Sequence, residues 1–182
     1  MAAAARLCCR SNDRHVARTR SLPMIQCPQM AKRSAGLLMY RRKGGVLEVL
    51  LVHPGGPYWA RRDEGAWSFP KGEYDSGLED ALDAAKREFT EETGFAPGTR
   101  HLSLGEARQR GGKLVSAWAF EGDCDPEALV SNTFELEWPP RSGTLRTFAE
   151  ADRGAWFATA SARRSILPGL VVFIDRLEAL RP

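Results

Sequence analysis

The sequence places three glutamates, Glu88, Glu91 and Glu92, at spacings suited to binding a metal ion. On an α-helix these positions are i, i+3 and i+4, so the three side chains share one face. Like charges at this spacing repel each other, whereas an acid and a base four residues apart attract. A divalent cation reverses the repulsion, because Mg²⁺ and Mn²⁺ bind carboxylate oxygens together with water and phosphate. The cluster therefore predicts a metal site, although the short segment EFTEE taken alone also fits an acidic surface helix.

The longer segment 72–95, GEYDSGLEDALDAAKREFTEETGF, resembles the Nudix box, G-x5-E-x7-R-E-U-x-E-E-x-G-U, in which U is a bulky apolar residue. Every fixed position from Glu79 onward matches, and Pro70-Lys71-Gly72 resembles the usual lead-in. Six residues instead of five separate Gly72 from Glu79, so this loop holds one extra residue. A flexible loop absorbs one residue at little cost. We therefore expect the metal site to be retained, while the placement of Gly72 relative to Glu79 stays open.

The resemblance implies an α/β (α+β) fold, a Nudix-like α/β/α sandwich with a mixed β-sheet, over residues 31–182. It also implies a hydrolase that uses Mg²⁺ or Mn²⁺ as its cofactor and cleaves a diphosphate linkage in a nucleotide-type substrate. By position in the box, the implied metal ligands are Glu88, Glu91 and Glu92. The implied catalytic residues are Glu88, Arg87, which anchors the carboxylates, and Glu79, and the structural positions of the motif are Gly72 and Gly94.

The resemblance leaves the general base and the substrate-binding residues open. The base is either Glu88 or one of four later carboxylates, Glu135, Glu137, Glu150 and Asp152. Lys71 or Arg41 is expected to meet a substrate phosphate. Tyr58, Trp59 and Trp67 could stack on a base, but the alternative is that Trp67 belongs to the core and the other two pack a loop.

The leading hypothesis is a pyrophosphohydrolase acting on a small nucleotide, either a nucleoside triphosphate or a dinucleoside polyphosphate. A non-catalytic nucleotide-sensing module is one alternative, but it does not need the complete set of box carboxylates. Removal of diphosphate from an RNA 5′ end is another alternative. No nucleic-acid or membrane partner is expected, and the sequence does not indicate an oligomeric state. A prenyl diphosphate isomerase would need a suitably placed cysteine, which we do not find.

The elements that must position these residues follow from hydrophobic periodicity. The clearest element is a helix over residues 80–93, with Gly94 at its end and an apolar face of Leu78, Leu82, Ala85 and Phe89. Two strands at residues 34–41 and 46–53 are predicted to form a hairpin. Further strands are predicted at 67–69, 100–108, 113–120 and 132–138, and further helices at 160–166 and 170–180. This order predicts a mixed sheet with helices on its faces.

The composition separates a basic arm from a nearly neutral body. The chain has 182 residues, 43% of them hydrophobic, and a net charge of +3. Residues 1–30 hold five arginines and one acid, which leaves 21 basic and 22 acidic residues in the rest. A body without basic excess argues against a general nucleic-acid binder. Residues 1–30 are predicted to be a disordered arm, an incorrectly assigned translation start or a targeting segment. Four cysteines without zinc or disulfide spacing favour a reducing, cytoplasmic location.

Overall fold

The first two strands form the predicted hairpin, and a turn of two glycines joins them. β1 (Arg33–Lys43) and β2 (Val46–Pro54) pair antiparallel across Gly44 and Gly45, whose φ angles of 57° and 80° suit a tight hairpin turn. The computed structural model describes residues 32–182, so the prediction for residues 1–30 lies outside the described residues. Within the described part of the chain, no helix is both long and apolar enough to span a bilayer.

The main sheet is mixed, as predicted. Its strands run in the order β4 (Leu102–Arg108), β5 (Leu114–Glu121), β1, β2 and β8 (Ala151–Ala158), with β3 (Lys71–Glu73) paired to the start of β1. β1 and β5 are parallel, and the other pairs are antiparallel. The order of the strands along the chain therefore differs from their order in the sheet.

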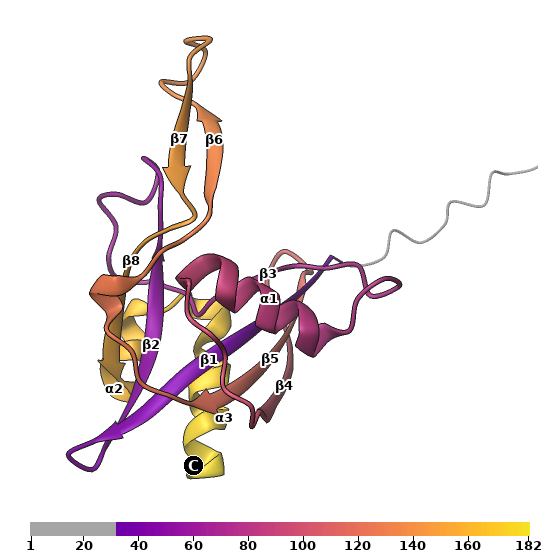
Figure 1. The fold of residues 1–182 in the computed structure, drawn as a ribbon, viewed down its shortest axis with the longest axis vertical. Coiled ribbons are helices and arrows are strands. Elements are labelled where there is room, and N and C mark those ends of the chain that lie inside the picture. The colour runs from indigo at the N-terminus through magenta and orange to yellow at the C-terminus, as the bar shows by residue number, and fades with distance from the viewer. Residues whose placement is uncertain (1–31) are drawn as a thin grey trace, which may run out of the picture. The chain divides into compact units, whose positions relative to one another are not determined.

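Helices cover both faces of the sheet, which confirms the sandwich (Figure 1). α1 (Ala81–Thr93) lies on one face, and α2 (Thr159–Ser165) and α3 (Val171–Leu180) lie on the other. Alternate residues of β1 enter the two cores: Ala35, Leu37 and Met39 pack toward α1, whereas Leu38 and Tyr40 pack toward α2 and α3. Because β1 is buried on both faces, its sequence contains a continuous run of apolar residues.

Both ends of α1 are defined by local chemistry. The Asp80 side chain accepts a hydrogen bond from the backbone N–H of Leu82 at 2.8 Å, and Gly94 ends the helix in the left-handed conformation with φ 75°. The prediction for Leu78 was wrong, since this side chain is 87% exposed in the loop before the helix. Ala84, Ala85, Phe89 and Thr93 form the buried face, which leaves the glutamates on a different side.

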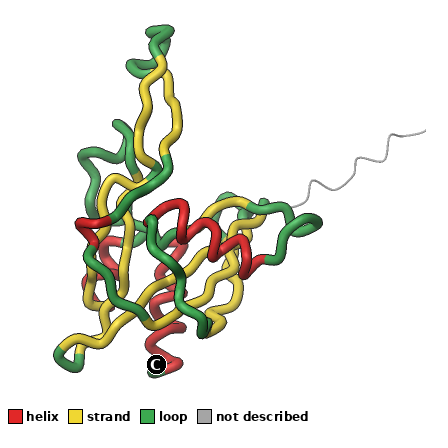
Figure 2. Tube along the Cα trace, in the orientation of Figure 1, coloured by secondary structure: helices red, strands yellow, loops and turns green. Residues whose placement is uncertain are grey.

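Two strand predictions are corrected by the structure, and two further strands were not predicted. Residues 67–69 form only isolated bridges, Val52 with Ser68 and Trp67 with Ile166, and the short strand β3 follows Pro70 instead. β6 (Thr133–Glu137) does not join the main sheet but pairs with the unpredicted β7 (Leu145–Ala149) in a separate ribbon. Figure 2 shows this ribbon projecting from the rest of the described chain. The unpredicted β8 pairs with β2. Two short 3₁₀ turns, η1 (Pro126–Ala128) and η2 (Pro168–Leu170), complete the fold.

Candidate functional site

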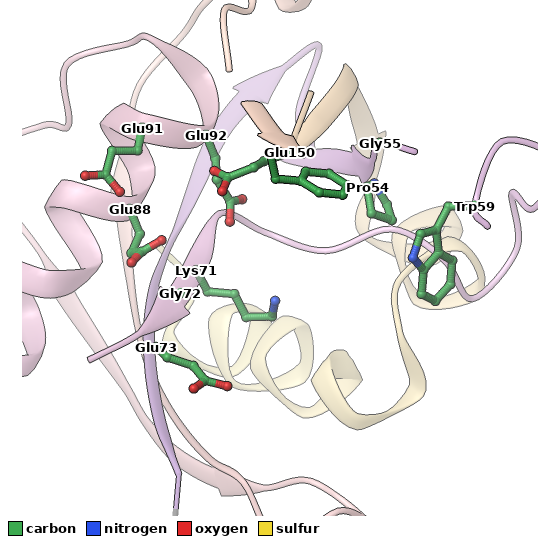
Figure 3. Close-up of a pocket in the computed structure, with 11 residues that line it drawn as sticks. Pro54, Gly55, Trp59, Lys71, Gly72, Glu73, Glu88, Glu91, Glu92 and Glu150 are labelled. Carbon is green, nitrogen blue, oxygen red and sulfur yellow. The ribbon is translucent and has the colours of Figure 1, made fainter. Parts of the chain in front are cut away.

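A cavity of about 500 Å³ lies beside the glutamate face of α1 (Figure 3). Five separate parts of the chain line it: the end of β2, the loop that follows, β3, α1, and the segments around β6 and β7. The lining residues are Pro54, Gly55, Trp59, Lys71, Gly72, Glu73, Glu88, Glu91, Glu92, Phe134 and Glu150. The three glutamates that the sequence predicted as metal ligands therefore share one pocket with Lys71, Gly72 and Trp59.

Arg87 joins the acidic residues of the motif by hydrogen bonds. Its Nε and Nη2 donate to the two carboxylate oxygens of Glu79 at 3.1 and 3.0 Å, a paired geometry that favours strong binding. Its Nη1 donates to Glu88 Oε1 at 2.7 Å and to Glu91 Oε2 at 3.0 Å. The hydrogen bonds to Glu79 have the largest effect in raising the pKa of Arg87 above its ordinary value, and the bond to Glu88 adds to it. Arg87 thus holds the predicted carboxylates in one arrangement.

Gly72 allows Glu88 to lie directly against β3. A Cβ atom at residue 72 would overlap both carboxylate oxygens of Glu88. Pairing of Gly72 with Ala35 of β1 fixes the backbone at this point. The glycine of the motif is therefore needed for a close approach, and its role does not depend on an unusual backbone angle.

Burial and neighbouring charges shift the pKa values of three pocket residues. Burial is the main reason that the pKa of Glu92 rises to about 7, although Lys71 acts in the opposite direction. Burial also raises the pKa of Glu88, against the hydrogen bond from Arg87. Burial lowers the pKa of the Lys71 ammonium group, and Glu92 opposes that shift. In this pocket, burial disfavours the charged forms of Glu88, Glu92 and Lys71, and the neighbouring opposite charges offset this effect only in part.

Of the four later carboxylates considered as a general base, Glu150 lines the pocket. Its backbone is fixed on both sides, since Glu150 N–H donates to Asn132 O at 2.8 Å and Glu150 O accepts from Gly55 N–H at 2.9 Å. Its charge acts on both Glu88 and Glu92. The other three carboxylates do not line this pocket, and Asp152 is instead paired with His53 at 2.9 Å.

The aromatic residues divide between the pocket and other sites. Trp59 lines the pocket, opposite the glutamates in Figure 3. Tyr58 is 60% exposed and packs edge-on against Trp138, with 5.3 Å between ring centroids. Trp67 belongs to the core, which was one of the two alternatives. Phe134 forms part of the pocket wall, and sequence reasoning missed it because it lies 39 positions beyond the motif, where nothing local marks it.

Arg41 lies away from the pocket, so the structure does not bring it to the predicted phosphate position. It hydrogen-bonds to Glu48 at 2.8 Å and to Asp123 at 2.6 Å, and its guanidinium group lies over the Trp156 ring at 4.1 Å. These contacts join three strands to a loop. Lys71 therefore remains the candidate for a phosphate contact.

The loop with the extra residue is a compact turn. The Asp75 carbonyl accepts hydrogen bonds from the N–H groups of Leu78 and Glu79, both at 3.0 Å, and its carboxylate accepts from Gly77 N–H at 2.8 Å. The exposed Leu78 lies in this turn. The insertion is accommodated in the solvent-facing turn, and Glu79 still reaches Arg87.

The pocket residues fit a hard divalent cation such as Mg²⁺ or Mn²⁺ in donor chemistry. Glu88, Glu91 and Glu92 offer only carboxylate oxygens, and the raised pKa values of Glu88 and Glu92 mean that their ionised forms gain from a nearby cation. Over residues 32–182, no three acidic, histidine or cysteine side chains are already gathered as a metal cage. Arg87 binds one carboxylate oxygen of Glu88 and one of Glu91, which leaves the other oxygen of each side chain for a cation.

Comparison with known proteins identifies the family and similar folds. The family model described as the NUDIX domain matches residues 30–168. No curated protein sequence matches the chain. Among solved structures, a C. elegans Ap4A hydrolase binary complex is 22% identical with a TM-score of 0.54, over 83% of this chain and 98% of that one. The NUDIX domain of Shewanella oneidensis NrtR complexed with ADP ribose is 15% identical with a TM-score of 0.58, over 84% and 89%.

A third similar structure is the C-terminal domain of mouse MUTYH in its complex with human PCNA, 17% identical with a TM-score of 0.54, over 83% of this chain and 90% of that one. At these identities the structural similarities concern the fold. The family model covers most of the chain and includes all of the residues of the motif. The chain therefore belongs to the NUDIX domain family.

Proposed function

We propose that this chain is a metal-dependent hydrolase that cleaves a diphosphate linkage in a small nucleotide. The observation that carries the proposal is the composition of one pocket, in which three helix glutamates, an ammonium group and an aromatic wall meet. The acids suit a cation, the ammonium group suits a phosphate, and the aromatic wall suits a base. A binding site for a nucleotide with a reactive diphosphate needs all three.

Each part of the pocket has a separate task in this proposal. A Mg²⁺ or Mn²⁺ ion held by Glu88, Glu91 and Glu92 would offset the charge on the phosphate oxygens and acidify a bound water. Lys71 donates hydrogen bonds to a phosphate oxygen, and Arg87 keeps Glu79, Glu88 and Glu91 in place. This alignment favours turnover, because small displacements of reacting groups lower the rate.

Proton transfer is assigned to Glu150. The oxygen of water forms a bond to one phosphorus atom as the bridging P–O bond of the diphosphate breaks. Glu150 takes a proton from the water, and the bridging oxygen leaves as part of a phosphate group. Glu150 suits this role because its carboxylate lies in the pocket while its backbone is fixed at both peptide groups.

The aromatic wall favours a substrate that contains a base. Trp59 lies in the pocket lining on the side away from the helix acids (Figure 3), and Phe134 also lines the pocket. A base against Trp59 would direct the phosphates toward Lys71 and the glutamates. The similarity to an Ap4A hydrolase and to a NUDIX domain bound to ADP ribose supports a nucleotide with a diphosphate linkage. We therefore place nucleoside triphosphates and dinucleoside polyphosphates first among the substrates.

The test is a panel of nucleoside triphosphates, dinucleoside polyphosphates and ADP ribose, with Mg²⁺ or Mn²⁺ and chromatographic detection of products. We expect turnover of at least one compound, and a loss of roughly 100-fold or more in Glu88→Gln and in Glu92→Gln. Asp83→Asn is the matched control, since Asp83 is an exposed acid of the same helix that pairs with Lys86. Wild-type turnover in both glutamine variants would contradict the metal assignment. Binding without turnover of any compound would instead indicate a nucleotide-sensing module.

A further inference from the structure

His53 is fully buried at the end of β2, directly before two residues of the pocket lining. Its Nδ1 lies 2.9 Å from Asp152 Oδ1 on β8, and its Nε2 lies 2.7 Å from the backbone carbonyl oxygen of Arg62. A backbone carbonyl oxygen only accepts hydrogen bonds, so Nε2 of the ring donates to Arg62.

The hydrogen bond to Arg62 fixes the middle of the loop between β2 and β3. Arg62 N–H donates to Trp59 O at 2.8 Å, and Trp59 N–H donates to Gly56 O at 3.4 Å. The Arg62 guanidinium group also lies 5.5 Å from the centroid of the Trp59 ring. The path from His53 to the pocket thus passes through one residue, Arg62, whose backbone binds both His53 and Trp59.

The remaining neighbours of His53 fix the far end of the same loop. The Trp67 ring packs edge-on against the imidazole, with 5.2 Å between centroids, and its Nε1 donates to Asp63 Oδ1 at 2.9 Å. Asp63 also pairs with Arg153 at 3.5 Å, and the Arg153 guanidinium group lies over Trp67. His53 is thus a buried polar residue of β2 that contacts both Asp152 on β8 and the loop at Arg62.

We propose that His53 is a positioning residue for substrate binding: by donating to the Arg62 carbonyl from the end of β2, it holds Trp59 at the pocket wall, where the base of the nucleotide packs. This inference rests on the proposed function and assigns a role to a residue that touches neither metal nor phosphate. His53 acts through Arg62 and Trp59, so it affects the binding of the base and leaves the chemistry at the phosphates unchanged.

Two substitutions separate the two hydrogen bonds of the ring. The side-chain nitrogen of glutamine lies as many bonds from Cβ as Nε2 of histidine, and that of asparagine as many as Nδ1. His53→Gln therefore retains a donor for Arg62, whereas His53→Asn retains only the donor for Asp152. Both variants lose the ring and its contact with Trp67, so they differ only in which hydrogen bond is kept, the bond to the loop in His53→Gln or the bond to β8 in His53→Asn.

The first measurement is hydrogen exchange by mass spectrometry on residues 55–66, which does not depend on activity. We expect faster exchange in His53→Asn and near wild-type exchange in His53→Gln, with His101→Asn as the control for loss of the other described histidine. Equal exchange of this segment in the two His53 variants would overturn the proposal. If His53→Asn fails to fold, NMR of the wild-type ring decides, and an Nε2 without a proton would overturn the proposal.

The second measurement separates binding from chemistry for a nucleotide that the panel identifies. We expect KM to rise about three- to tenfold in His53→Asn, the effect of one hydrogen bond, with little change in kcat and with recovery in His53→Gln. Inhibition by inorganic tripolyphosphate, which has phosphates but no base, stays unchanged. A fall in kcat at constant KM would overturn the role in base binding. If no nucleotide is turned over, the proposed function fails, and hydrogen exchange still decides whether His53 holds the loop.

Discussion

Replacing Gly72 with alanine gives the sharpest test of how the metal site is built. The added Cβ would overlap both carboxylate oxygens of Glu88. Since non-bonded heavy atoms settle roughly 3.5 Å or more apart, the carboxylate must retreat by more than about 1 Å. The atoms that move are the end of a flexible side chain, and Gly72 has no positive φ. The substitution therefore displaces a proposed metal ligand without straining the backbone.

The expected consequence is a loss of activity with little change in stability. A misplacement of about 1 Å can reduce turnover on the order of 100-fold, while a Gly-to-Ala change at an unstrained position alters the free energy of unfolding by no more than about 1 kcal/mol. The assays are steady-state turnover of the identified nucleotide over a range of Mg²⁺ concentrations and urea unfolding. We expect a higher Mg²⁺ concentration at half-maximal activity and an almost unchanged unfolding midpoint.

Gly111→Ala provides the matched control, because a Cβ at Gly111 meets no atom within 4 Å. It should leave both turnover and stability unchanged. Full activity and an unaltered Mg²⁺ requirement in Gly72→Ala would refute the argument that the site needs Glu88 against β3. A loss of more than about 2 kcal/mol in the free energy of unfolding would refute the argument that the collision is relieved by the side chain alone.

Two further predictions follow from shifted pKa values. Burial raises the pKa of Cys124 to about 11, so at pH 8 the thiolate fraction of this residue should be on the order of 100-fold lower than that of an ordinary cysteine. Alkylation of Cys124 by iodoacetamide, followed by peptide mass spectrometry, should therefore be slow in the folded protein. Rapid alkylation would contradict the burial. Hydrogen bonds from Arg163 lower the pKa of Glu178, so this pair stabilises the folded state above the pKa of the unfolded chain, and its contribution is lost as pH falls through the folded pKa. Urea unfolding between about pH 7 and 3 should therefore show the advantage of wild type over Glu178→Gln shrinking below about pH 4, and a constant difference would disprove it.

The helix half of the site was predictable because its information is local. The periodic acids and the end of the predicted helix over residues 80–93 all lie within one short segment. The structure has this helix at Ala81–Thr93, with Gly94 at its end. The hairpin of β1 and β2 is local in the same sense, since Gly44 and Gly45 join two adjacent apolar runs. Neither prediction requires knowledge of contacts between distant residues.

The other half of the pocket depends on such distant contacts. Phe134 reaches the wall through the separate ribbon of β6 and β7, and Glu150 reaches it through backbone bonds to Gly55 and Asn132. β8 was missed because its apolar residues do not alternate clearly with polar ones. Arg41 was placed with the substrate because its partner Asp123 lies 82 residues further along the chain, beyond the range of any local pattern.

The extra residue between Gly72 and Glu79 shows which distances the site constrains. Gly72 is positioned by pairing with Ala35 in the sheet, whereas Glu79 is positioned by two hydrogen bonds from Arg87 on the helix. These two constraints are independent, so the number of residues between them matters only if the connecting turn pulls on either end. The turn closed by Asp75 faces solvent and leaves Leu78 exposed, so it transmits no such strain. The spacing within the helix is different, because Arg87 must reach residues one and four positions further along the same helix at once. An insertion there would rotate Glu91 and Glu92 away from Glu88 by about 100° for each added residue, and the shared face for the cation would be lost.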